Sequence, residues 1–136
     1  MVSKNYDVQN IEIKATPDVV YNFLAEPTNV PKWALGFSEV NGETAVMETP
    51  NGKMKIGMKM NCHTELRTID SIMTMPDGSI GKAFSRITEN DDGASSIFTF
   101  ILMAPPVPLE ELEGTLEEQK KQLAEELLLL KSILEN

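Results

Sequence analysis

The C-terminal stretch, residues 109–136, is the feature that most constrains how this chain folds. It reads LEELEGTLEEQKKQLAEELLLLKSILEN, and its leucines recur at three- and four-residue spacing while Glu, Lys and Gln occupy most other positions. This spacing predicts a single amphipathic helix roughly 39 Å long. The leucines of its apolar stripe are Leu109, Leu112, Leu116, Leu123, Leu127, Leu130 and Leu134. Such a helix requires an equally long apolar partner, which the preceding residues must supply.

Strands and turns are predicted for the middle of the chain. Four dipeptides there are strong hairpin signals: Asn41-Gly42, Asn51-Gly52, Asp77-Gly78 and Asp92-Gly93. They separate predicted strands near 37–40, 43–49, 53–63, 65–75, 79–89 and 95–103. The strand near 53–63 is the clearest, because Met54, Ile56, Met58, Met60 and Cys62 alternate with mostly polar residues. One apolar and one wet face predict an antiparallel sheet that covers the C-terminal helix.

Another strand and two short helices are predicted ahead of this sheet. Residues 6–15 read as the first strand, and Thr16 is the expected N-cap of a helix that starts at Pro17 and stops at Pro27. A second short helix carries Trp33. The resulting fold class is α+β: a strongly curved antiparallel sheet of about six to seven strands wraps around the long helix. We expect one domain over residues 1–136 and a space between sheet and helix.

This order of elements resembles the SRPBCC superfamily, also called START-like or the birch-pollen-allergen fold. The opening of the chain carries the resemblance, with Thr16-Pro17-Asp18 followed by Val20, Tyr21, Phe23, Leu24, Pro27 and Trp33. Tyr21 stands where the family commonly has Trp. The resemblance covers essentially the whole chain and implies a helix-grip fold with a deep, mostly apolar cavity. In that superfamily such cavities hold lipids, polyketides, cofactors or hormones, and the motif itself implies no catalytic residue.

Composition excludes several classes of partner. The net charge of −9, with no local cluster of Lys and Arg, argues against nucleic acid and against an anionic membrane surface. The N-terminus has no apolar signal segment, no apolar run is long enough to span a bilayer, and one cysteine excludes an internal disulfide. These features predict a cytoplasmic protein without membrane insertion. No motif for a metal, a nucleotide or another cofactor is present.

Two residues that often carry chemistry are predicted to be inert here. Strand parity places His63, the only histidine, on the solvent side with Lys53, Lys55 and Lys59. The same parity places Cys62 on the apolar face, where a small core residue is expected rather than a nucleophile. With these residues on opposite faces, a joint metal site is not expected.

The candidate site residues are those expected to face the cavity. The residues predicted to bind a ligand are Trp33, Met58, Met60, Phe84, Arg86, Phe98, Phe100, Leu123 and Leu127. Arg86 has the parity of Phe84, so a cavity position for Phe84 would bring a guanidinium to an anionic or carbonyl-bearing ligand. A surface position that pairs Arg86 with Glu89 is the alternative. Asp70, whose face the pattern leaves undecided, is the other catalytic candidate, and a pair with Arg86 across the cavity is a further option.

Three functions remain open at this stage. The leading hypothesis is binding of a small hydrophobic or amphipathic ligand, lipid- or polyketide-like, between sheet and helix. The second is a polyketide cyclase or dehydratase-like enzyme using Arg86 or Asp70. The third is a protein-interaction module without a ligand. Leu128 and Leu129 lie off the main stripe, and the last strand is apolar on both faces, so either surface is a candidate homodimer contact.

Overall fold

The computed structural model describes residues 5–49, 52–105 and 116–135. Its strands are β1 (Tyr6–Ile13), β2 (Phe37–Val40), β3 (Thr44–Thr49), β4 (Gly52–His63), β5 (Thr68–Thr74), β6 (Ile80–Asn90) and β7 (Ser95–Met103). Its α-helices are α1 (Pro17–Ala25), α2 (Val30–Trp33) and α4 (Leu116–Leu134), with short 3-10 turns at Pro27–Asn29 and Asp91–Gly93. The predicted α+β class and order of elements are therefore confirmed. The expected start of the last helix at Leu109 lies outside the described residues.

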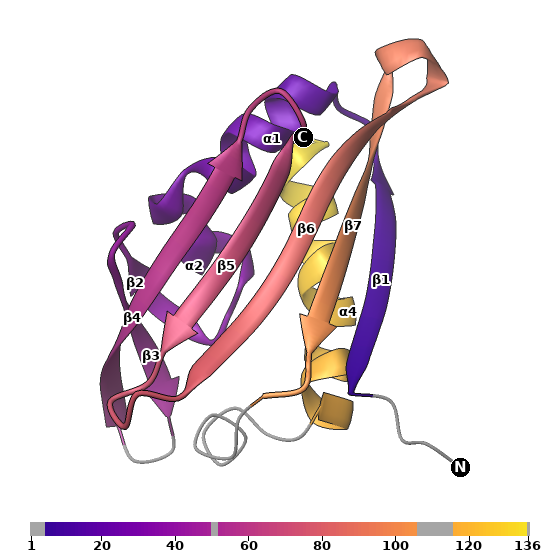
Figure 1. Cartoon of the computed structure of the whole chain (residues 1–136). Coiled ribbons are helices and arrows are strands. Elements are labelled where there is room, and N and C mark those ends of the chain that lie inside the picture. The colour runs from indigo at the N-terminus through magenta and orange to yellow at the C-terminus, as the bar shows by residue number, and fades with distance from the viewer. Residues whose placement is uncertain (1–4, 50–51, 106–115, 136) are drawn as a thin grey trace.

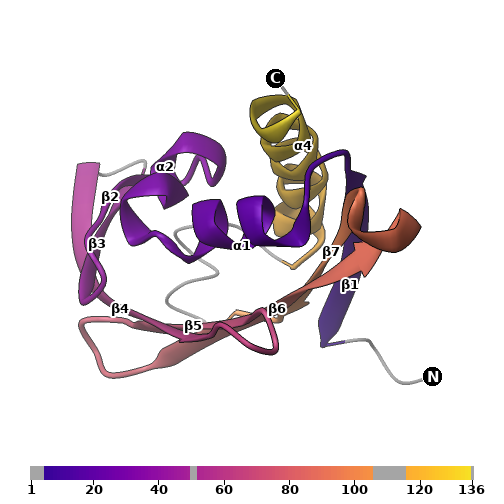
Figure 2. The same ribbon diagram turned by 90° about the horizontal axis from the view of Figure 1, so that it is seen from above.

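The seven strands form one antiparallel sheet in the order β1-β7-β6-β5-β4-β3-β2. From β2 to β7 each strand pairs with its neighbour in sequence, and β1 closes the order by pairing along its whole length with β7. The turns have the chemistry that the sequence predicts: Gly42 and Gly78 adopt φ values of +100° and +89°, which residues with a side chain rarely adopt. The sheet is strongly curved, and α1, α2 and α4 all lie on its concave side (Figures 1 and 2).

The side chains between sheet and helices form two adjoining apolar clusters. The larger joins α1 and α4 to β1, β6 and β7 and includes the fully buried Ile13, Val20, Ile87, Phe98 and Leu130. The smaller lies under α2 and the β2–β4 region and includes Val40, Ala45, Met47, Ile56, Met58 and Met75. The methionines of β3 and β4 thus fill the part of the core that the long helix does not reach.

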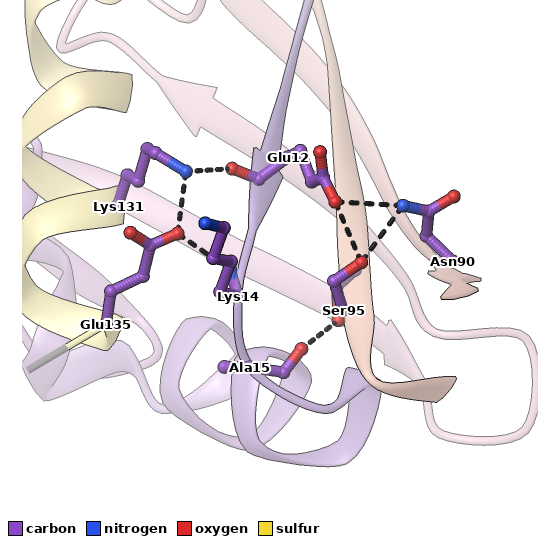
Figure 3. A network of polar contacts seen from close by, with 8 residues as sticks. Glu12, Lys14, Ala15, Asn90, Ser95, Lys131 and Glu135 are labelled. Atoms are coloured by element: carbon purple, nitrogen blue, oxygen red, sulfur yellow. Dashed lines mark hydrogen bonds and ion pairs between the residues drawn. The ribbon is translucent and has the colours of Figure 1, made fainter. Parts of the chain in front are cut away.

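A network of polar contacts fixes the C-terminal end of α4 against β1 (Figure 3). Lys131 Nζ donates to the Glu12 carbonyl at 2.7 Å and pairs with Glu135 at 2.6 Å. Glu135 in turn accepts from the Lys14 backbone N–H at 2.7 Å. On the other side of β1, the Glu12 carboxylate accepts from Asn90 and Ser95, both at 2.9 Å. The helix is therefore held in register with the sheet edge by directional contacts as well as by its leucines.

The described part of the chain contains no helix that is both long enough and apolar enough to cross a membrane. In α4, a glutamate or lysine interrupts every turn except the Leu127–Leu130 run. The helix is therefore amphipathic, with one face on the sheet and the other exposed.

Candidate ligand-binding cavity

A cavity of about 230 Å³ lies between the concave face of the sheet and helices α2 and α4. Its sheet wall is built from residues of one phase of the central strands, such as Met58 of β4, Ser71 of β5, Ser85 of β6 and Phe100 of β7. The small side chains of Ser71, Ala83 and Ser85 leave the space, while larger ones such as Met58 and Phe100 surround it. Helix α4 contributes one further wall through Gln119, Gln122, Leu123 and Glu126, of which only Leu123 belongs to the leucine stripe.

Most of the residues predicted to bind a ligand are found at this cavity. Those that line it are Trp33, Met58, Met60, Phe98, Phe100 and Leu123. Leu127 is 3 % exposed and lies in the core cluster beside the cavity. The structure therefore brings residues from α2, β4, β7 and α4 to one place, as alternation and helical spacing predicted. Their contact with a ligand stays a prediction.

Phe84, Arg86 and Asp70 lie on the opposite, convex face of the sheet. Phe84 is paired directly with Asp70 on one side and with Ile101 on the other, and these residues border a shallow depression outside the sheet. The expected cavity positions of Phe84 and Arg86 are therefore not what the structure shows. Asp70 and Arg86 lie near each other on that face, but these two described residues form no ion pair.

The physical reason is that β6 has apolar residues in both of its phases. The phase that faces the cavity holds Ala83, Ser85 and Ile87, all buried, whereas Phe84 is half-buried in the other phase. On the convex face Phe84 packs in a cross-strand row with Ile101 and, one strand further, Val8. The presence of Phe84 therefore did not indicate which phase of β6 faces the cavity, because the floor of the cavity is formed by the small side chains of Ala83 and Ser85.

Cys62 is exposed at the end of β4, so its expected place in the core is wrong. Desolvation of the thiol raises its pKa, an effect that the neighbouring Tyr21 hydroxyl partly offsets. A raised pKa leaves little thiolate at neutral pH, which argues against a nucleophile. His63, next to it, is exposed as predicted. Within the described residues no group of three His, Cys, Asp or Glu side chains could hold a metal ion.

Glu126 of α4 is the functional candidate that the sequence reasoning missed. It is buried, with 8 % of its surface exposed, and lines the cavity. Its Oε2 accepts from the Leu35 backbone N–H at 2.6 Å and from Gln122 Nε2 at 3.2 Å. Desolvation raises the pKa of this carboxyl, although the two hydrogen bonds act against the shift. A signal was present in the sequence: Glu126 is three residues after Leu123 and four before Leu130, so it lies within the apolar stripe.

Trp33 lies at the cavity wall together with two phenylalanine rings. Its ring meets those of Phe98 and Phe100 edge to face, with centroids 6.2 and 6.4 Å away. Its Nε1 is buried, yet it has no hydrogen-bond partner among the described residues. A buried donor without a partner normally costs free energy. Ser85, in contrast, is satisfied, since its hydroxyl donates to the Ile69 carbonyl at 3.0 Å.

Comparisons with known proteins place this architecture among START-like folds. A START superfamily protein from Mycobacterium smegmatis matches with a TM-score of 0.73 at 10 % identity, over 96 % of this chain and 97 % of the other. The Zhui aromatase/cyclase from Streptomyces sp. R1128 matches with a TM-score of 0.68 at 11 % identity, over 96 % and 93 % of the two chains. The di-domain aromatase/cyclase BexL matches with a TM-score of 0.68 at 15 % identity, over 95 % of this chain and 46 % of its own.

These structural matches establish the fold. The chain has the START-like helix-grip fold, with the curved seven-stranded sheet and long C-terminal helix that the sequence resemblance implied. No protein-family model matches the sequence. No curated protein matches it either. Identities of 10–15 % carry no information about ligand or reaction.

Proposed function

We propose that this protein binds a small hydrophobic or amphipathic molecule in the cavity between the sheet and α4. The observation that carries the proposal is the cavity itself, lined by aromatic, methionine and aliphatic side chains with a few polar groups at its wall. Small-molecule sites in proteins have this composition, with apolar burial supplying affinity and isolated polar groups fixing orientation. The methionines Met58 and Met60 add a wall that adapts to ligand shape.

Two experiments test this proposal directly. Native mass spectrometry of the purified protein should detect a bound small molecule, or a hydrophobic compound should raise the melting temperature as ligand binding stabilises the native state. The variant Ser71→Trp places a large ring in the cavity and should abolish that response. Thr74→Trp, on the same strand but on the exposed convex face, is the matched control and should keep it. Equal ligand binding by both variants would contradict the proposed site.

A cyclase-like activity is the second candidate, and the structure changes the residues that would carry it. Asp70 and Arg86 lie outside the cavity, whereas the carboxyl of Glu126 lies at its wall and has a raised pKa. Enolisation or dehydration of a polyketone needs a general acid, and a raised pKa favours the protonated carboxyl that such a role requires. Incubation with a linear poly-β-ketone mimic tests this. Turnover that falls in Glu126→Gln while substrate affinity is kept would support an enzyme, and absence of turnover would leave binding alone.

A further inference from the structure

The charges at the cavity wall restrict the head group of any ligand. The charged side chains among its described lining residues are Glu48 and Glu126; no Lys, Arg or His is among them. A carboxylate or phosphate placed there would lose its hydration without gaining a cation and would face like charge. Anionic ligands such as fatty acids are therefore disfavoured, and a neutral or cationic head group remains.

Glu126 is a buried carboxyl at the cavity wall, and only one of its two oxygens has hydrogen-bond donors among the described residues. Its Oε2 is occupied by the Leu35 N–H and Gln122 Nε2, whereas its Oε1 has no hydrogen-bond partner among the described residues. It forms no ion pair with any described residue. Buried carboxylates are normally paired, because an isolated charge away from water is costly. The two fixed donors on Oε2 orient the carboxyl and leave Oε1 available at the cavity wall.

Aromatic residues that line the same cavity suit the same head group. Trp33, Phe98 and Phe100 form a cluster with ring centroids 6.0–6.4 Å apart and planes inclined by 72–85°, and all three line the cavity. Aromatic faces carry negative partial charge and attract organic cations within about 6 Å. Aromatic rings and a carboxylate in one cavity, with no basic residue among its described lining, form a combination that suits an ammonium group.

We propose that the ligand of this cavity is a hydrophobic amine, whose ammonium group pairs with Glu126 while its apolar body lies among the aromatic and methionine side chains. This inference rests on the proposed binding function and specifies its ligand class. Arg86, on the convex face, has no part in this recognition.

Three probes with one skeleton and different head groups test the proposal: phenylbutylamine, phenylbutanol and phenylbutyrate. Isothermal titration calorimetry at pH 7.5 measures the Kd of each for the full chain. Since a hydrogen bond to a charged group is worth about tenfold in affinity or more, the amine should bind at least tenfold more tightly than the alcohol. The carboxylate should bind most weakly.

Two glutamine variants connect the preference to one residue. Glu126→Gln keeps an acceptor for the Leu35 N–H but removes the charge, so the ratio of amine to alcohol affinity should fall to about one. Glu125→Gln makes the same change on the exposed neighbour and should keep the ratio. A carboxylate probe that binds as tightly as the amine, or an amine preference that persists in Glu126→Gln, would overturn the inference while leaving a binding cavity in place. Failure of all three probes to bind would also overturn it. The Ser71→Trp and mass spectrometry tests then decide the binding function separately.

Discussion

Replacing Leu130 by Ala tests the assignment of the buried face of α4. Leu130 is fully buried, and Leu128, two residues earlier in the same run of leucines, is 64 % exposed. The loss of three buried carbons costs about 2.4 kcal/mol at about 0.8 kcal/mol each. The sheet and the neighbouring leucines collapse only partly into the vacated space, which brings the expected loss to about 3–4 kcal/mol.

Urea denaturation followed by circular dichroism measures this loss. With an m-value of about 1.5 kcal/mol/M, Leu130→Ala should lower the midpoint by about 2 M. Leu128→Ala is the matched control, because it makes the same chemical change in the same helix, and it should alter stability by less than about 0.5 kcal/mol. Equal losses of unfolding free energy in the two variants would refute the assignment of Leu130 to the buried face of α4 and Leu128 to the exposed face. A loss in Leu128→Ala that depends on protein concentration would instead indicate the homodimer contact that the sequence suggested.

Three further predictions concern polar and titratable groups. The pKa of Glu126 is raised in the folded protein, so the contribution of this carboxyl to stability is present below the ordinary Glu pKa of about 4.3 and is lost as pH rises through the raised pKa. In thermal unfolding, Glu126→Gln should therefore be more stable than the wild type at pH 7 but not at pH 4. A wild-type advantage at pH 7 would contradict this. Cys62 should react with iodoacetamide more slowly than a free cysteine at pH 7, and Tyr21→Phe should slow it further, because the tyrosine hydroxyl lowers the thiol pKa. An unchanged alkylation rate in Tyr21→Phe would contradict the effect of the tyrosine hydroxyl on the thiol pKa. Ser96→Ala should cost about 1 kcal/mol or more, since the buried Ser96 hydroxyl donates to the Ala15 carbonyl at 2.8 Å; a neutral result in urea denaturation would refute that role.

Much of the fold followed from local pattern, because the signals that define it are short in range. The four Asn/Asp-Gly dipeptides located four of the five hairpins, since positive φ is a property of the turn residues themselves; the turn between β4 and β5 has no such dipeptide. Leucine spacing located the last helix, and the alternation in β4 located its inner face at Met58 and Met60. Cys62 keeps that parity and lies next to the Tyr21 hydroxyl of α1, yet at the end of the strand it is exposed.

Local sequence patterns could not predict which side chains of β5 and β6 face the cavity. Alternation divides a strand into two phases, but it does not say which phase is concave when both contain apolar residues. In β6, Phe84 and Ser85 lie on opposite faces of the sheet. Phe84 is paired with Ile101 on the convex face, so the small Ser85 lies at the floor of the cavity. The faces of Arg86 and Asp70 followed from the same register.

The sequence by itself determined the long amphipathic helix, the hairpins and the apolar strand of methionines, because each depends on residues close together in the chain. Glu126 shows what the tertiary structure alone decided. Its place in the leucine stripe was readable, but its partner, the Leu35 N–H, is 91 residues away in sequence. Burial, hydrogen bonding and the raised pKa of this carboxyl arise only when α4 and the loop after α2 meet over the sheet. A helix spacing fixes which residues share a face, whereas the chemistry of that face depends on what the fold places against it.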